Sequence, residues 1–162
     1  MNRNEYNTTV KELSNHLYNY ALKFLRNEND AQDIVQDVFE KLWINKKKVD
    51  KLKAKSWMFT TAHNAMINFS NRSKRSISME NSQLPEQAKM EVNMFESNEL
   101  VQRAVGILPP LQKSIILLRD LEGYSYEEIG NLLSISDSQV KVYLFRARKK
   151  IKKQLKGLAE LV

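Results

Sequence analysis

Apolar residues recur every three or four positions along most of this chain, which is the spacing of amphipathic helices. Asn29 or Asp30 is the expected N-cap of a helix over residues 30–43. Pro110 suits the first position of a helix over residues 111–121, where a missing amide costs nothing. No segment alternates with period two, so we expect an all-α fold. The pattern predicts helices over residues 4–26, 30–43, 56–72, 98–108 and 111–121.

Two further helix starts follow one another within SYEEIGNLLSISDSQVKVYLFRARKK, residues 125–150. The sequences S-Y-E-E (125–128) and S-D-S-Q (136–139) both match the capping box, in which a Ser and a Glu or Gln satisfy each other's free amides. An apolar stripe joins the two predicted helices, and Gly130 lets the second approach the first closely. The segment is either an ordinary helical hairpin or a helix-turn-helix unit.

The charge of the chain is unevenly distributed, and this favours the helix-turn-helix interpretation. Residues 1–75 carry a net charge of +6, residues 76–99 a net charge of −4, and residues 100–162 a net charge of +5. Solvated lysines explain much of the basic content but not its segregation. Because each neutralised phosphate releases counterions, two basic blocks indicate that both ends of the chain bind a polyanion.

The last predicted helix has the side chains that read base edges in a major groove. Gln139 suits adenine, Lys141 or Arg146 suits guanine, and Val142 or Phe145 suits a thymine methyl group. The remaining cations lie further along the helix, where phosphates are expected: Arg148, Lys149, Lys150, Lys152 and Lys153.

Several classes of protein are disfavoured by composition. The chain has no Cys and only two His, so we expect neither a metal site nor a catalytic centre, and no cofactor. No apolar run approaches twenty residues, which argues against a membrane span, and the polar N-terminus argues against a signal peptide. A reducing cytoplasm is the expected location.

Three motifs, in this order, resemble the extracytoplasmic-function sigma factors of bacterial RNA polymerase: DAQDIVQDVFEKLW, SWMFTTAHNAMINF, and LPPLQKSIILLRDLEGYSYEEIGNLLSISDSQVKVYLFRARKKI. The resemblance covers residues 10–155. It implies two small helical domains, a three-to-four-helix sigma region 2 over residues 1–75 and a four-helix sigma region 4 over 98–162. Residues 76–97 would form a flexible acidic linker between them.

The resemblance also implies partners. The polar face of the second helix would dock on the β′ clamp helices of core polymerase, and region 4 on the β flap. The pattern alone favours a solvated helix face, and it is the resemblance that favours docking instead. An anti-sigma factor is a further expected partner. The implied polymerase-binding residues are Asp33, Gln36, Asp37 and Glu40.

In the family, the third helix captures the unwound −10 element of the promoter, and the loop before its Trp and an Asn seven residues later hold one flipped base. Here these positions are residues 48–55 and Asn64. Trp57 is either a core residue or a stacking platform, and His63 is a polar or phosphate-facing residue. The expected −10 residues are Lys53, Lys55, Trp57, Phe59, His63, Asn64 and Arg72.

Region 4 would read the −35 element, and here the sequence departs from the family. Tyr143 replaces a usual Arg, and Val142 a usual Ser, which puts the usual base contacts in doubt. Ser134 stands where Gly is usual, so it must accept an unusual backbone angle. The expected −35 residues are Ser138, Gln139, Lys141, Val142, Phe145, Arg146, Arg148 and Lys149.

We therefore predict a sigma factor that binds core RNA polymerase and directs transcription from promoters with −10 and −35 elements. A helix-turn-helix regulator that acts without polymerase is the main alternative. An enzyme such as a nuclease is a weaker one, because neither His has a partner at a suitable spacing. A pure interaction adaptor would not depend on Arg146 or Lys149.

Overall fold

The computed structural model describes residues 1–80 and 97–161, and within these residues every regular element is helical. The prediction of an all-α fold is therefore confirmed for this part of the chain. Residues 81–96, which hold most of the predicted linker, lie outside it. The elements are α1 (Arg3–Leu25), α2 (Glu28–Asn45), the short 3-10 helix η1 (Lys51–Lys53), α3 (Ala54–Glu80), α5 (Ser97–Gly106), α6 (Pro110–Asp120), α7 (Tyr126–Leu133) and α8 (Asp137–Leu161).

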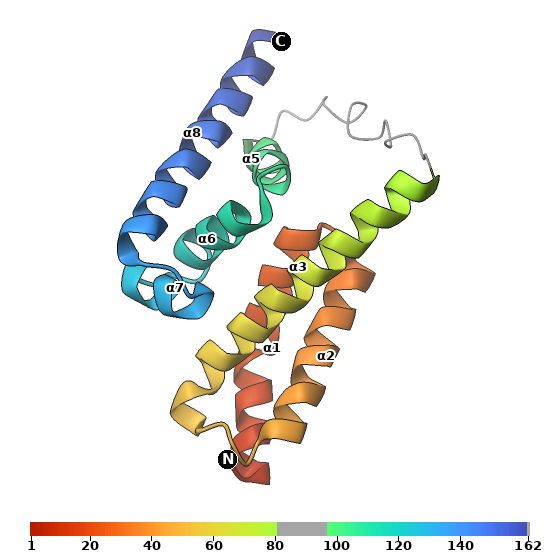
Figure 1. The fold of residues 1–162 in the computed structure, drawn as a ribbon, viewed down its shortest axis with the longest axis vertical. Coiled ribbons are helices and arrows are strands. Elements are labelled where there is room, and N and C mark those ends of the chain that lie inside the picture. Colours follow the sequence, from red (N-terminus) through yellow and green to blue (C-terminus); the bar gives the residue numbers. More distant parts are fainter. Residues whose placement is uncertain (81–96, 162) are drawn as a thin grey trace.

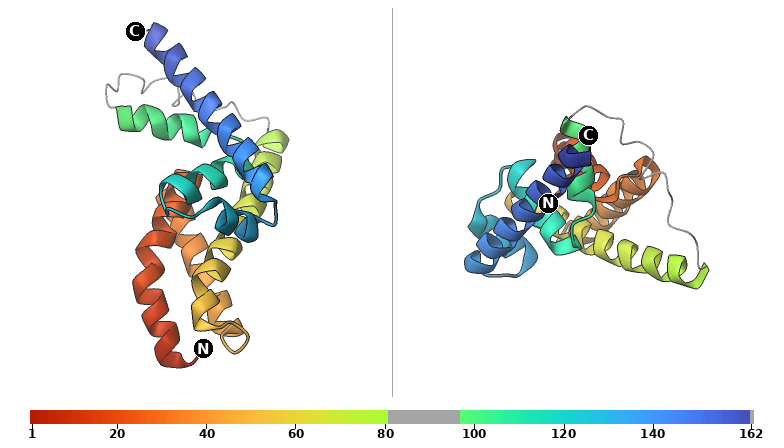
Figure 2. Two further views of the ribbon diagram at one scale, coloured as in Figure 1. Left: turned by 90° about the vertical axis from the view of Figure 1, so that its left-hand side faces the viewer. Right: turned by 90° about the horizontal axis from the view of Figure 1, so that it is seen from above.

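Helices α1, α2 and α3 form one group, here called the first unit, and α5 to α8 form another, called the second unit (Figure 1). The second unit sits against the C-terminal part of α1 and the first half of α3, and the two views in Figure 2 agree on this placement. No described helix is both long and apolar enough to cross a lipid bilayer.

Two helix boundaries in the first unit differ from the predicted ones. The cap of α2 is Asn27, whose side chain accepts a hydrogen bond from the amide of Asp30 at 2.9 Å, whereas we expected Asn29 or Asp30 as the cap. This earlier start places Glu28 and Asp30 in the first turn, where the helix dipole favours carboxylates. Helix α3 runs to Glu80 instead of ending at 72, because no Gly or Pro interrupts it there.

The turn between α7 and α8 has the geometry that its sequence requires. Ser134 adopts the left-handed conformation with a φ of 59°, at a position where glycine is favoured. A Cβ on Gly130 would lie only 2.7 Å from the carbonyl oxygen of Ile135. Gly130 therefore allows the close approach of the turn that leads into the second helix, whose first residue, Asp137, has its Oδ1 atom 3.5 Å from the same position.

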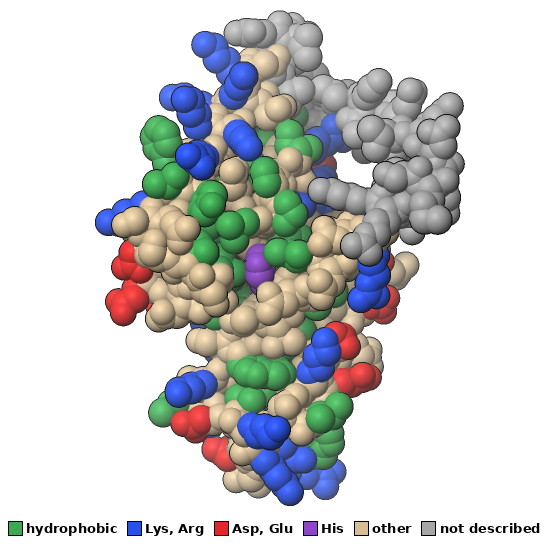
Figure 3. Space-filling view, in the orientation of Figure 1, with side chains coloured by type: hydrophobic (Ala, Val, Ile, Leu, Met, Phe, Trp, Pro, Cys, Tyr) green, Lys and Arg blue, Asp and Glu red, His purple; other side chains and the backbone are tan. Residues whose placement is uncertain are grey.

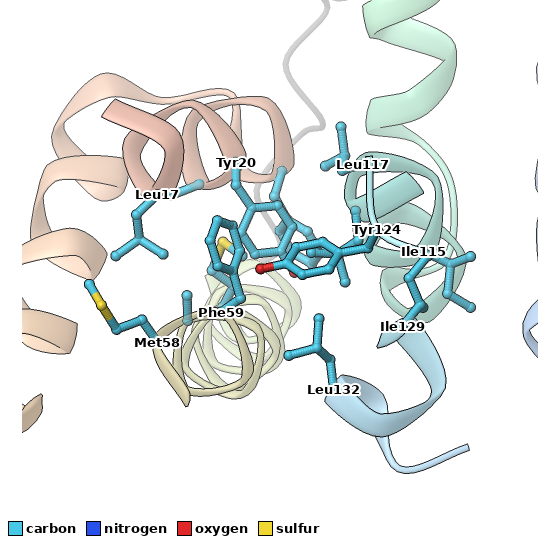
Figure 4. Close-up of a cluster of buried hydrophobic side chains, with 14 of the residues drawn as sticks. Leu17, Tyr20, Met58, Phe59, Ile115, Leu117, Tyr124, Ile129 and Leu132 are labelled. Atoms are coloured by element: carbon cyan, nitrogen blue, oxygen red, sulfur yellow. The ribbon is translucent and has the colours of Figure 1, made fainter. Parts of the chain in front are cut away.

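The two units share one continuous apolar core (Figure 4). Tyr20 and Phe59 of the first unit meet Tyr124 of the second, with the rings of Phe59 and Tyr124 5.7 Å apart in an edge-on arrangement. Ile115, Ile129 and Leu132 complete the second unit's side of this contact. Joint burial of these side chains stabilises the packing of the two units against each other, here called the closed arrangement.

Candidate nucleic-acid interface

Helix α8 presents its predicted reading residues to solvent. Its inner residues Val140, Leu144 and Ala147 are buried against α6 and α7, so the opposite face points outward. Val142 is 46% exposed and Phe145 69% exposed, so this face carries two apolar side chains among its cations. All eight residues predicted for the −35 element are exposed: Ser138, Gln139, Lys141, Val142, Phe145, Arg146, Arg148 and Lys149.

Two of these eight residues form a hydrogen bond or an ion pair within the chain, and the cations of Lys141 and Arg146 lie over the rings of Tyr126 and Tyr143. The Oε1 atom of Gln139 accepts a hydrogen bond from the amide of Ser136 at 2.9 Å, which completes the predicted capping box. Bidentate pairing of Gln139 with adenine would compete with this cap, because both use the same oxygen. Arg148 forms an ion pair with Asp120 of α6 at 2.9 Å.

The departures from the family pattern in α8 have different structural consequences. Tyr143 is half-buried and packs against the core, so it does not replace an Arg as a DNA-facing cation. The guanidinium carbon of Arg146 lies 5.9 Å from the centre of its ring. This cation–π contact orients Arg146 along the exposed face. Val142 lies on that face and offers an apolar surface where a hydroxyl is usual.

A second group of exposed cations, Lys53 of η1 and Lys55 of α3, lies at the start of α3. Asn64 and Arg72 are also exposed and lie further along the same helix. Lys and Arg side chains gather at the lower end of the molecule and again along α8 (Figure 3). These two gatherings match the two basic blocks of the sequence.

Leu52 is a candidate that the sequence analysis missed. Its residue surface is 89% exposed, and it lies on η1 between Lys51 and Lys53. The neighbouring Val49 and Ala54 are buried and anchor this turn on both sides. Proteins that unstack DNA insert apolar wedges of this kind beside cations. A large apolar residue between two lysines of the polar stretch KKKVDKLKAK is the sequence signal that could have identified Leu52.

Three other predicted −10 residues are less accessible. Trp57 is half-buried and packs against the core cluster. Phe59 is 1% exposed and His63 is 5% exposed, and both are covered where the second unit meets α3. In this arrangement of the units, DNA does not reach Phe59 or His63. Their assignment as −10 residues stays a prediction that requires the units to separate.

His63 takes part in a buried polar contact instead. Its Nδ1 atom lies 2.5 Å from the hydroxyl oxygen of Ser114 in α6, which in turn lies 2.8 Å from the hydroxyl of Tyr20 in α1. Burial lowers the pKa of His63 to about 4, because no opposite charge compensates the lost hydration. Burial also raises the pKa of Tyr20. The cluster is closed to solvent and is neutral at pH 7.

The polar face of α2 combines charge with an apolar cleft. Asp33, Gln36 and Glu40 are exposed, and Asp37 is half-buried with an ion pair to Lys41 at 3.0 Å. A shallow cavity of about 490 Å³ runs beside them, between α2 and α1. Gln36 and Glu40 line this cavity together with half-buried Val35 and Phe39, and with Tyr6 and Tyr18 of α1. A polar rim around an apolar centre is typical of protein–protein interfaces.

Metal chemistry finds no support in the described residues. None of them forms a group of three or more His, Asp or Glu side chains able to hold an ion. The hydrogen-bonded Ser114 and His63 are buried, so they do not present a nucleophile to a substrate. What these surfaces offer is binding: two basic faces, one with exposed apolar side chains on a helix, and a polar face on α2.

Two family models match this chain, and together they cover both units. The model described as Sigma-70 region 2 matches residues 9–76, and the model described as Sigma-70, region 4 matches residues 98–151. The first range contains most of α1, all of α2 and most of α3, and the second contains α6, α7, most of α5 and the first part of α8.

Curated relatives of similar length match most of the chain. The chain is 25% identical over 142 residues to the ECF RNA polymerase sigma factor SigM of Bacillus subtilis, covering 85% of this chain and 87% of the relative. It is 28% identical over 149 residues to the RNA polymerase sigma factor SigV of the same organism, covering 91% of this chain and 89% of the relative.

Solved structures share the fold at lower identity. The sigma factor RpoE, in its complex with the anti-sigma factor NepR from Bartonella quintana, matches with a TM-score of 0.75 and 20% identity, covering 93% of this chain and 96% of that chain. CnrH, in its complex with the cytosolic domain of CnrY, matches with a TM-score of 0.72 and 21% identity, covering 96% and 90%.

Proposed function

The chain belongs to the extracytoplasmic-function sigma factors of RNA polymerase, and from this membership we propose how its two units divide promoter recognition between them. As a sigma factor, it binds core RNA polymerase and directs transcription from specific promoters. The observation that carries the proposal is that the two matched sigma regions coincide with the two units that bear the basic faces. No feature of the described surface favours a regulator that acts without polymerase.

The second unit reads the −35 element through α8. The buried stripe of Val140, Leu144 and Ala147 fixes the helix on its own unit, which leaves a rigid outer face for the major groove. Among its residues, Arg146 is the best placed for guanine, because it is exposed and no described carboxylate pairs with it. Val142 and Phe145 offer apolar contacts to thymine methyl groups.

The first unit binds the −10 element as a single strand. Lys53, Lys55 and Arg72 line a path for the phosphates, and exposed Asn64 offers hydrogen bonds to a flipped base. We place Leu52 at the point where the duplex opens, because unstacking a step costs a few kcal/mol and an apolar wedge recovers part of that cost.

The polar face of α2, formed by Asp33, Gln36, Asp37 and Glu40, docks on the β′ clamp helices, and the second unit contacts the β flap. The apolar cleft beside Gln36 and Glu40 supports this assignment, because a docking helix would find both an apolar centre and a polar rim there. In this proposal the chain performs no catalysis itself and works in the cytoplasm, where polymerase acts.

Gel filtration of the tagged chain with bacterial core polymerase tests this proposal without knowledge of the promoter. We expect a one-to-one complex that survives moderate salt. Replacing Gln36 and Glu40 together by Ala should weaken that complex at least tenfold while the helix content stays unchanged. The matched control replaces Lys11 and Glu12, two exposed residues of α1 outside the docking face, and should bind as the wild type does. Equal binding by both double variants would show that the docking face does not lie on α2.

An anti-sigma factor is the second protein partner that we propose. The two structural relatives RpoE and CnrH were both solved in complexes, RpoE with the anti-sigma factor NepR and CnrH with the cytosolic domain of CnrY, which supports this partner for a chain of the same fold. A library from the genome that encodes the chain should contain a gene whose expression silences a promoter that the chain drives. Recovery of no such gene from a complete library would contradict the proposal.

A further inference from the structure

Three polar side chains form a buried chain of hydrogen bonds across the interface between the two units. Tyr20 and His63 belong to the first unit and Ser114 to the second. Tyr20 and Ser114 have no exposed surface, and His63 has 5%. The Ser114 hydroxyl oxygen lies 2.8 Å from the Tyr20 hydroxyl and 2.5 Å from Nδ1 of His63. Both hydrogen bonds therefore break when the units separate.

Both hydrogen bonds among Tyr20, Ser114 and His63 can be made, with no donor hydrogen left over, only when His63 is neutral. Ser114 has one hydrogen to donate. With a neutral imidazole protonated on Nε2, Tyr20 donates to Ser114 and Ser114 donates to Nδ1 of His63. A protonated imidazole donates from Nδ1 instead, so Ser114 can no longer donate to His63. Either Ser114 or Tyr20 then has a hydrogen without an acceptor among the three residues, and a charge lies buried without a counterion.

Other contacts surround the hydrogen bonds of Tyr20, Ser114 and His63 and belong to the same interface between the units. The hydroxyl of Thr60 donates to the carbonyl of Leu132 at 3.2 Å, and the ammonium of Lys113 donates to the carbonyl of Phe24 at 3.1 Å. At the rim, Arg26 pairs with Glu99 at 3.1 Å. Phe59 and His63 lie under this interface, although both are among the residues predicted to contact the −10 element.

The closed arrangement does not fit a promoter. The −35 and −10 elements lie about 25 base pairs apart, which is roughly 85 Å of duplex at about 3.4 Å per pair. A compact chain of this length has a radius of gyration of only about 15 Å. One closed molecule therefore cannot contact both elements, and the interface must open before the first unit can use its full set of residues.

We propose that the buried chain Tyr20–Ser114–His63 is a latch that holds the free protein closed, and that protonation of His63 releases it. While the latch is closed, in the absence of polymerase and promoter, the second unit covers Phe59 and His63. Its role in withholding −10 residues from DNA rests on the proposed function, whereas the closed state and its release do not.

The sign of the pH dependence follows from the burial of His63. Its pKa is about 4 in the closed state and near the ordinary 6.5 when the units separate, so the closed state binds fewer protons. The closed state has its full advantage above pH 6.5 and loses it as the pH falls from 6.5 toward 4. Between pH 7.5 and 5.5 the ratio of closed to open molecules should fall about tenfold.

Other titratable groups in the interface do not reproduce this response. Burial raises the pKa of Tyr20 and of Tyr124, so both stay neutral in this range. His16 of α1 lies 3.3 Å from Glu122 across the interface and is the other imidazole of the chain. A His16→Gln background removes it, so that any remaining imidazole response belongs to His63.

Spin labels on the full chain test the latch without polymerase or DNA. The sequence has no Cys, so Lys11→Cys on α1 and Gln154→Cys on α8 give one label on each unit at exposed sites. In the His16→Gln background we expect one population of short distances between the labels at pH 7.5. At pH 5.5 the ratio of long-distance to short-distance molecules should be about tenfold higher. Ser114→Ala should shift molecules to the open state at both pH values, and His63→Gln should abolish the pH response.

Thr61→Val is the matched control, because it removes a hydroxyl whose hydrogen bond, 2.7 Å to the carbonyl of Trp57, stays within α3. It should leave the distances unchanged. With only two His in the chain, an NMR titration also follows His63 directly and should give a pKa near 4 in the wild type and near 6.5 in Ser114→Ala. A pH response that survives His63→Gln, or a His63 that titrates near 6.5 in the wild type, would overturn the latch and would leave the proposed division of promoter recognition untouched.

Discussion

Helices α8 and α3 are the two candidate nucleic-acid readers, and the structure presents them in opposite ways. All eight predicted residues of α8 are exposed, and among the described contacts Gln139 and Arg148 are the two that form a hydrogen bond or ion pair within the chain. On α3 and the turn before it, Lys53, Lys55, Asn64 and Arg72 are exposed, but Phe59 and His63 lie beneath the second unit.

The difference shows that one reader is available in the free protein and the other is partly covered. Helix α8 makes its main contacts with α5, α6 and α7 of its own unit, and the side away from them is open. Helix α3 packs against its own unit on one side and against α7 of the other unit on another. A helix with two buried sides keeps only part of its surface for a ligand, and the remainder becomes accessible through a change of arrangement.

The largest expected effect distinguishes the inner and outer sides of α8 at two adjacent positions. Leu144 is 2% exposed, so Leu144→Ala should lower the free energy of unfolding by about 2–5 kcal/mol. Phe145 is 69% exposed, so Phe145→Ala should change it by no more than about 0.5 kcal/mol while it weakens binding to −35 DNA. Urea unfolding measures the first quantity. Equal destabilisation by both variants would show that α8 has no free outer face.

A smaller effect should separate two arginines of α8. Arg146→Ala should cost about 1–3 kcal/mol in the binding of the assembled holoenzyme to −35 DNA, because it removes a base contact. Arg148 is held by Asp120 at 2.9 Å, so Arg148→Ala should cost less than about 1 kcal/mol. Filter binding at fixed salt compares them. A larger loss from Arg148→Ala would place the reading edge of α8 on its other side.

The smallest expected effect concerns the exposed cations of the first unit. Each of Lys53→Ala and Lys55→Ala should lower the slope of log affinity against log salt by about 0.7 for single-stranded −10 DNA, because each removes one phosphate contact. Lys11→Ala, an exposed lysine of α1, should leave the slope unchanged. If all three variants give the same slope change, the affinity depends on overall charge and not on a path along α3.

Local features of the fold could be predicted from the sequence because neighbouring residues decide them. The two capping boxes that begin at Ser125 and Ser136 form as expected, since each needs only residues three apart. The positive φ of Ser134 also follows from its place after α7. The cap of α2 was placed wrongly because RNEND offers several Asn and Asp side chains, and any of them can accept the bond.

The covered part of the −10 surface was not predictable in the same way. Periodicity identifies the apolar face of α3, but it does not say which distant element packs there. His63 meets Ser114 from 51 positions away in the sequence, and Thr60 meets Leu132 from 72. Such contacts depend on how the two units pack, and the sequence between the units carries no periodic signal for that. The polymerase-facing and DNA-facing assignments themselves stay predictions.

Transcription in vitro tests the central claim most directly. Core polymerase with the purified chain should be given fragments of the genome that encodes it, and the starts of the transcripts should be mapped. The account predicts a small set of starts that share two upstream motifs, near −35 and −10, and that disappear with Arg146→Ala. Starts identical to those of core polymerase alone, although the complex forms, would contradict the account.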